Sequence, residues 1–221
     1  MVQVLYEDNH LIAVAKPHGV LVQGDDTGDP TILDEVKLYL KEKYHKPGNV
    51  FLGVIHRLDR PVAGILLLAK TSKGASRVSE QFRAHTMKKV YHAVVVGVPK
   101  QQESLLVHHL RKDTAKNIVY AMDKPTNETQ EARLTYSVVK DNGEFSLLRI
   151  ELHTGRPHQI RTQLSFIGHQ IVGDVKYGSN VPFTKGAIAL MATELSFTTA
   201  TTNEHVDLHL DVPESFTKFV V

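Results

Sequence analysis

Residues 50–70, VFLGVIHRLDRPVAGILLLAK, decide how the chain is expected to fold. Two apolar runs, residues 50–55 and 65–69, predict strands. The residues between them, 56–64, are expected to form an irregular loop. Loops held by rigid elements often carry functional side chains, so this loop is the first candidate for chemistry.

The loop carries one carboxylate between two arginines. Arg57 and Arg60 flank Asp59, and their positive charge favours the ionised form of its carboxyl group. An ionised carboxylate can act as a nucleophile or as a base. The alternative is an ordinary surface ion pair, and the loop alone does not decide between the two.

Further strands are predicted on both sides of this stretch. They cover residues 2–6, 11–15, 90–98, 105–107, 118–122, 132–139, 145–152, 188–197 and 206–210. Most of these strands are joined by hairpins, and only a few helices interrupt them. The pattern predicts an α+β fold with a mixed, largely antiparallel central sheet flanked by helices. The length of 221 residues favours one domain over residues 1–221.

Three helices are predicted from their capping residues. Thr31 with Asp34 three residues later forms a capping-box pattern. Ser72 is expected to cap a second helix. Pro157 suits the first position of a third helix, and Gly168 suits its C-terminal cap.

Composition excludes several classes of protein. Apolar residues make up 42% and charged residues 23% of the chain, as in ordinary globular proteins. Cysteine is absent, which excludes disulfides, thiolate metal ligands and a cysteine nucleophile. No apolar run approaches the ~20 residues of a membrane span, and the first ten residues do not resemble a signal peptide. We therefore expect a cytoplasmic protein without membrane contact.

Charge is distributed unevenly along the chain. Residues 1–45 hold four lysines against eight acidic residues, and residues 190–221 hold one lysine against five. Residues 56–92 hold eight lysines or arginines against two acidic residues. This basic middle segment favours an anionic ligand, with nucleic acid as the leading candidate. The alternative is a solvated helix face, because several of these charges recur at helical spacing.

Two later motifs carry further candidates. Tyr91, in Lys89-Val90-Tyr91, can stack on a base or move a proton, or it is simply a core tyrosine. In residues 154–161, Arg161 lies at the shoulder of a helix and needs a partner, for which Asp59 is a candidate. The helix N-terminus together with Arg156 can hold a phosphate. The alternative for this second motif is a purely structural ion pair.

Several catalytic classes find no support in the sequence. It contains no H-E-x-x-H zinc motif, no phosphate-binding loop, no dinucleotide fingerprint and no nucleophile elbow. A glycosidase needs a second catalytic carboxylate, whereas arginines surround Asp59. We expect neither a metal nor a cofactor.

Taken together, the motifs resemble the RluA family of pseudouridine synthases. The motifs that carry the resemblance are the opening residues 11–19, His56-Arg57-Leu58-Asp59 with residues 64–70, Lys89-Val90-Tyr91, residues 155–161 and the glycine-rich stretch 168–178. Each motif is weak alone, but they occur in the family's order over nearly the whole chain. The resemblance implies the pseudouridine synthase fold, without the extra N-terminal RNA-binding module of some relatives.

The resemblance also implies an activity, in which uridine in ribosomal or transfer RNA is isomerised to pseudouridine without a cofactor. Asp59, Tyr91 and Arg161 are the implied catalytic residues, acting on a uridine flipped out of a stem-loop. The implied substrate-binding residues are His56, Arg57, Lys89, Arg156 and His158. We expect a monomer.

Two other functions remain open at this stage. A non-catalytic RNA-binding protein could retain the fold, although binding alone does not need the trio of aspartate, tyrosine and arginine. An unrelated carboxylate hydrolase would require a second acid in its pocket.

Overall fold

The computed structural model describes residues 2–221, and its contacts group into two compact units. The first unit comprises the residues up to Met87 together with Ala192–Leu210. The second comprises Lys88–Met191 and Asp211–Val221. That the two units act as a single domain stays a prediction.

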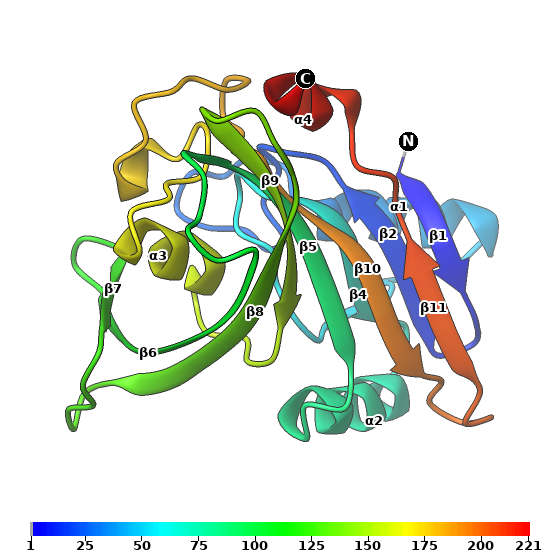
Figure 1. Cartoon of the computed structure of the whole chain (residues 1–221). Coiled ribbons are helices and arrows are strands. Elements are labelled where there is room, and N and C mark those ends of the chain that lie inside the picture. The colour runs from blue at the N-terminus through cyan, green and yellow to red at the C-terminus, as the bar shows by residue number, and fades with distance from the viewer. Residues whose placement is uncertain (1) are drawn as a thin grey trace. The chain divides into compact units, whose positions relative to one another are not determined.

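The first unit is built on an antiparallel sheet (Figure 1). Its strands are β1 (Gln3–Glu7), β2 (Leu11–Lys16), β3 (Gly53–Val54), β4 (Ala63–Ala69), β10 (Leu190–Thr198) and β11 (His205–His209). They lie in the order β1-β2-β4-β10, with β11 beside β10 and β3 beside β4. Of the strand predicted over residues 50–55, only the two residues of β3 pair with β4. The strand β10 also lies beside β4.

Both faces of this sheet are buried, which explains the unbroken apolar run in β4. Alternate side chains of a strand point to opposite faces. Leu66 and Leu68 pack with Val36 of α1 (Ile32–Lys43) on one face. Leu67 packs with Val78 of α2 (Ser72–Arg83) on the other face.

The caps of these two helices follow the sequence closely. The predicted capping box of α1 is confirmed, because the Thr31 hydroxyl and the Asp34 carboxylate each accept the other residue's backbone N–H. For α2 the predicted cap is wrong by one residue. Thr71 is the cap, since its extended backbone lets its hydroxyl accept from the Gly74 N–H at 3.1 Å, while Ser72 is already helical.

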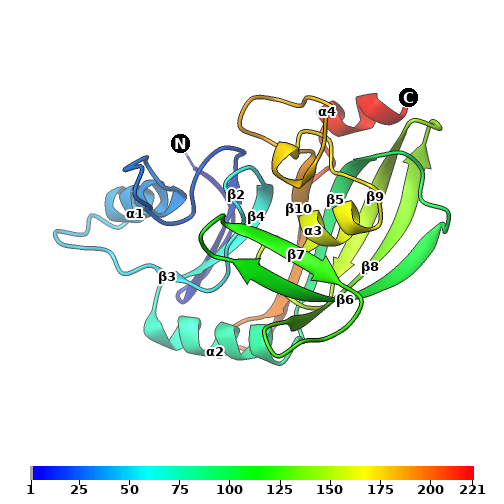
Figure 2. The same cartoon turned by 90° about the vertical axis from the view of Figure 1, so that its left-hand side faces the viewer.

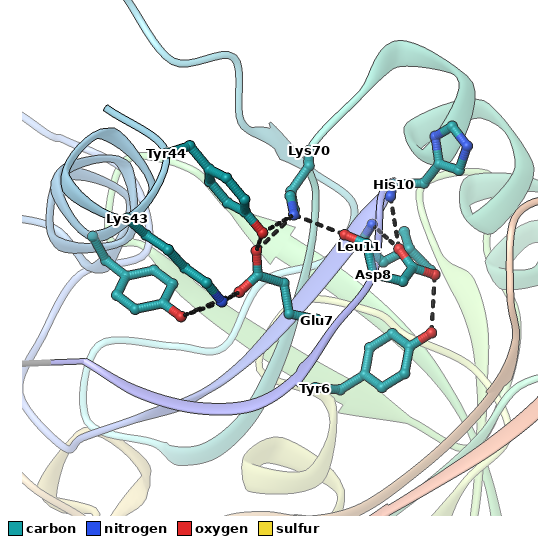
Figure 3. A network of polar contacts seen from close by, with 9 residues as sticks. Tyr6, Glu7, Asp8, His10, Leu11, Lys43, Tyr44 and Lys70 are labelled. Atoms are coloured by element: carbon teal, nitrogen blue, oxygen red, sulfur yellow. Dashed lines mark hydrogen bonds and ion pairs between the residues drawn. The ribbon is translucent and has the colours of Figure 1, made fainter. Parts of the chain in front are cut away.

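A charged network at the end of β1 fixes α1 to β4 (Figure 3). The Glu7 carboxylate accepts hydrogen bonds from Lys43 at 2.7 Å, from Lys70 at 2.6 Å and from the Tyr44 hydroxyl at 2.6 Å. Burial alone would raise the pKa of Glu7, but these donors outweigh it and lower the pKa to about 2. One carboxylate thus ties together three elements of the first unit.

The strands of the second unit also pair in antiparallel fashion (Figure 2). Its strands are β5 (Lys88–Val96), β6 (Glu103–Asp113), β7 (Ile118–Met122), β8 (Gln130–Asp141) and β9 (Phe145–Leu152), in the order β5-β9-β8-β6-β7. The helix α3 (Gln159–Phe166) contacts β6 and β7. The short helices are η1 (Val175–Tyr177), α4 (Glu214–Thr217) and η2 (Lys218–Val220). The predicted α+β class with largely antiparallel pairing is confirmed.

The ends of α3 show where local signals succeed and fail. Its predicted start at Pro157 is wrong, because His158 has a left-handed backbone (φ 50°) and the helix begins at Gln159. Its predicted end is confirmed. Gly168 has φ 87°, and its N–H bonds to the Ser165 carbonyl while the next N–H bonds to the Leu164 carbonyl, the pattern of a glycine cap.

Candidate active site

The loop that carries Asp59 lies between β3 and β4 in the first unit. Leu58 is buried and anchors the loop, while Arg57 is exposed and Asp59 is half-buried. The Val62 N–H donates to the Asp59 carbonyl at 3.0 Å and closes a tight turn. The carboxylate therefore sits on a well-defined backbone rather than on a loose surface loop.

A second segment, residues 17–20, holds this loop through its backbone. The Gly19 N–H donates to the Arg60 carbonyl at 2.9 Å, and the Arg60 Nε donates back to the Gly19 carbonyl at 3.0 Å. The His18 Nδ1 lies 2.9 Å from the Pro61 carbonyl. These contacts fix the path of the loop and so set the place from which the Asp59 side chain starts.

Lys16 is a buried cation beneath the same loop, and its place in the sequence predicted no role for it. Its side chain is 1% exposed, and its Nζ donates to the carbonyls of Pro17, Val20 and Arg60 at 3.0, 2.8 and 3.3 Å. Burial lowers the pKa of Lys16 to about 8, and attraction to the Asp59 carboxylate opposes that shift. Lys16 thus holds the backbone of the loop at Arg60 and is attracted to the Asp59 carboxylate on the same loop.

His56, at the start of the loop, makes contacts that position it. Its Nε2 accepts a hydrogen bond from the Leu67 N–H at 3.0 Å, which leaves the proton of a neutral ring on Nδ1. Its ring stacks on Phe82 of α2, with centroids 4.9 Å apart and planes at 26°. These contacts hold the loop to β4 and α2. Its substrate-binding role stays a prediction.

Gly64, where the loop enters β4, cannot be replaced by a larger residue without strain. Its φ is 119°, a region that favours glycine. A side-chain carbon at this position would also overlap the backbone of Ala192 in β10. The glycine of the motif is therefore needed for close backbone packing.

In the second unit, Arg161 on α3 forms a bidentate ion pair with Asp174. The Arg161 Nε lies 2.7 Å from one carboxylate oxygen and its Nη2 lies 2.8 Å from the other. Arg161 is 5% exposed and Asp174 is 1% exposed, so the pair is desolvated. Asp174 lies in the glycine-rich stretch, but the sequence did not single it out. The predicted pairing of Arg161 with Asp59 stays a prediction.

Tyr177 joins two of the predicted site residues. The Arg161 guanidinium carbon lies 5.0 Å from the centre of its ring, close enough for cation–π attraction. The His158 Nδ1 lies 2.7 Å from its hydroxyl, which also accepts the Val119 N–H at 3.0 Å. The second unit therefore brings Arg161 and His158 together around one buried tyrosine that the sequence did not identify.

The other predicted residues of this unit are Lys89 and Tyr91 on β5 and Arg156 in the loop before α3. Lys89 and Tyr91 are both buried and lie two residues apart on β5. Burial lowers the pKa of Lys89. The Arg156 Nε donates to the Glu131 carbonyl at 3.1 Å, so part of its guanidinium is already engaged. The roles assigned to these three side chains stay predictions.

Among residues 2–221, no group of three or more His, Cys, Asp or Glu side chains is arranged to hold a metal ion. In the same range, no helix has both the length and the apolar character needed to span a membrane.

Comparison with known proteins decides the family. A family model described as RNA pseudouridylate synthase matches residues 10–166, well over half of the chain. The chain belongs to this family. It is an RNA pseudouridine synthase, an isomerase, and the RluA-type relatives described below confirm the resemblance found in the sequence.

Three relatives show how far the similarity of this pseudouridine synthase extends. An uncharacterised RNA pseudouridine synthase of Chlorobaculum parvum is 31% identical over 96% of this chain and 71% of its own length. The tRNA pseudouridine synthase C of Vibrio parahaemolyticus is 31% identical over 98% of this chain and 94% of its own. The ribosomal large subunit pseudouridine synthase D of Yersinia pestis is 32% identical over 83% of this chain, which spans 55% of that relative.

A solved structure shares the fold of this synthase. Human RNA pseudouridylate synthase domain containing 4 superposes with a TM-score of 0.80 at 23% identity, covering 97% of this chain and 90% of that one. The fold implied by the sequence motifs is thereby confirmed.

Proposed function

We propose that this synthase isomerises specific uridines in structured ribosomal or transfer RNA, with Asp59 as the catalytic aspartate acting on a flipped-out uridine. The observation that carries the proposal is the position of Asp59. It is half-buried on a loop held by backbone hydrogen bonds above a buried lysine, inside the matched family segment. The printed names of the relatives, which include both tRNA and ribosomal enzymes, support the class of RNA.

The reaction balances without a cofactor. The bond between ribose C1′ and uracil N1 breaks, the base turns, and C1′ bonds to C5. The proton on C5 leaves and N1 gains one, so the product is an isomer of the substrate. In this proposal Asp59 acts on the sugar as nucleophile or as base, and a closed pocket retains the free uracil while it turns.

The remaining predicted residues have distinct parts in this reaction. Tyr91 stacks on the uracil and helps to remove the C5 proton. Arg161 pairs with Asp59 and keeps it ionised, and Arg57 fills the space left by the extruded base. The contacts to the RNA come from His56, Lys89, Arg156 and His158.

The proposal favours loops and stem-loops as targets. Extruding a base costs a few kcal/mol, and less where the base is unpaired. The protein is expected to act in the cytoplasm as a monomer.

Tritium release tests this function. Ribosomal and transfer RNA labelled with tritium at C5 of uridine are incubated with the wild type and with Asp59→Asn. We expect the wild type to release tritium and the variant to release none, while its RNA affinity stays within about tenfold. Absence of release by the wild type from both RNA classes would contradict the proposal, and so would equal release by the variant.

A further inference from the structure

A groove of about 460 Å³ lies on the first unit between α2 and the connection from β10 to β11. The helix contributes Lys73, Arg77 and Glu80, and the strands and their connection contribute Thr199 and His205. The volume is in the range of sites that hold a small organic ligand or a nucleotide unit, about 300–1,000 Å³. Nothing in the matched motifs assigns it a role.

The groove contains two cations that the fold does not neutralise. Lys73 and Arg77 are exposed and lie four residues apart on one face of α2, about 6 Å along the helix axis. Among residues 2–221, neither side chain has an ion-pair or hydrogen-bond partner.

Other cations of the basic segment 56–92 are engaged within the protein. Lys70 is paired with Glu7 at 2.6 Å, and Arg60 is paired with Asp29 at 2.6 Å. Fewer cations of the basic segment are therefore available to attract a ligand than the sequence suggests. Two of the available cations, Lys73 and Arg77, line one groove.

The walls of the groove are held rigidly before any ligand binds. The Gln81 side chain donates to the Thr198 carbonyl at 2.8 Å and accepts the Thr198 N–H at 2.9 Å, which joins α2 to β10. The Thr199 N–H donates to the Glu204 carbonyl at 2.9 Å, and the Thr199 hydroxyl accepts the Glu204 N–H at 3.0 Å. Because the groove is already formed, little free energy is lost in ordering its walls when a ligand binds.

The same helix supports the loop that carries Asp59. Phe82 stacks on His56 at the start of that loop, while Lys73 and Arg77 lie on the groove face of the helix. One rigid element thus joins the groove to the candidate catalytic loop within the first unit. A polymer that reaches Asp59 can contact this groove with a different part of its chain.

We propose that this groove is a second RNA-binding site, which holds the sugar–phosphate backbone of a segment outside the target uridine. The inference rests on the proposed function. Lys73 and Arg77 bind phosphate oxygens, and the Thr199 side of the groove supplies polar groups for the same oxygens. Glu80 accepts a hydrogen bond from a ribose 2′-hydroxyl, which favours RNA over DNA or free phosphate.

The test compares two double variants with the same loss of charge and the same spacing. The groove variant, Lys73→Ala with Arg77→Ala, removes both positive charges from the groove. The matched control, Lys37→Ala with Lys41→Ala, removes two positive charges from α1. Their affinity for a substrate stem-loop and for the DNA of the same sequence is measured against salt concentration, together with kcat and KM for tritium release.

We expect the groove variant to bind RNA about tenfold more weakly at low salt, with a slope of log K against log salt that is shallower by about one to two. Its KM rises in proportion and its kcat stays within about twofold of wild type. The control keeps wild-type affinity and slope. Glu80→Gln reduces the preference for RNA over DNA.

The outcomes separate this inference from the proposed function. Wild-type affinity and slope in the groove variant, or an equal loss in both double variants, would overturn the groove while leaving the function intact. If the wild type releases no tritium but the groove variant alone loses RNA affinity, the groove is supported and the proposed function fails.

Discussion

The loop that carries Asp59 in the first unit and the side chain of Arg161 in the second are held in different ways. The main chain of the Asp59 loop accepts hydrogen bonds from residues 17–20 and from the Lys16 side chain. Arg161 is fixed through its own side chain, by two hydrogen bonds to the buried Asp174 carboxylate. The first arrangement fixes the main chain that carries the carboxylate, whereas the second uses much of the side chain's hydrogen-bonding capacity for structure.

The comparison shows two ways of fixing the position of a charged residue. Fixing the main chain around Asp59 sets the direction of its side chain, and its carboxylate attracts the buried Lys16 ammonium. Fixing Arg161 by a desolvated ion pair sets its direction too, but it makes the fold depend on the pair. Substitutions at the two places should therefore have different consequences for stability and for turnover.

The largest stability effect is expected from Asp174→Asn. The substitution removes the carboxylate charge that faces the buried Arg161 guanidinium, and breaking a buried pair in this way costs about 3–5 kcal/mol. Urea unfolding of both proteins measures the difference. The matched control is Asp29→Asn, which breaks the exposed Arg60 pair and should cost less than about 1 kcal/mol. Equal effects of the two variants would remove the distinction drawn above.

A smaller effect is expected from Lys16→Met, which keeps the length of the side chain but removes three hydrogen bonds to carbonyls. The substitution avoids the free-energy cost of burying a charge, but it leaves three buried carbonyls without their donor. Because the second effect is larger, we expect the free energy of unfolding to fall by about 2 kcal/mol at pH 7. Turnover should fall as well, because the Asp59 loop loses an anchor. Unchanged stability and turnover would show that the backbone contacts suffice without Lys16.

The pH dependence of the same pair of proteins sharpens this point. The pKa of Lys16 is about 8 in the folded protein, below its ordinary value of 10.5. Between these values the unfolded chain binds more protons, so wild-type stability rises with pH. Relative to Lys16→Met, the wild type should gain on the order of 3 kcal/mol from pH 8 to pH 10.5. A difference that stays constant with pH would contradict the buried ammonium.

The smallest effect is expected from Glu7→Gln, far from both sites in sequence (Figure 3). The pKa of Glu7 is lowered to about 2 from 4.5, so its contribution is complete above pH 4.5 and is lost as the pH falls toward 2. Allowing for solvent screening, this contribution is about 1–2 kcal/mol. Acid unfolding monitored by circular dichroism should show a flatter profile for the variant, and an unchanged profile would refute the role of the network.

Local patterns predicted much of the fold. The strands Ile118–Met122 and Phe145–Leu152 have the bounds expected from their apolar runs. β6 (Glu103–Asp113) is much longer than the predicted residues 105–107, because only part of it is apolar and one face is exposed. A continuous apolar run marks a strand more clearly than a segment whose exposed face carries polar residues.

The partners of the candidate site residues could not be predicted in the same way. Asp174 and Tyr177 contact Arg161 across 13 and 16 positions of the chain, and Lys16 reaches Arg60 across 44. Such contacts depend on tertiary packing, and no periodic pattern in the sequence indicates them. A lysine at the end of an apolar strand also suggests an exposed side chain, since lysine is rarely buried without partners.

The most direct test of the central claim is to measure folding and turnover on the same preparation of Asp59→Asn. If Asp59 is held by its backbone for chemistry, the variant should unfold within about 1 kcal/mol of wild type and release no tritium from C5-labelled uridine in RNA. Retained tritium release would contradict the account. So would a loss of stability comparable to that of Asp174→Asn, because Asp59 would then be part of the structure rather than the chemistry.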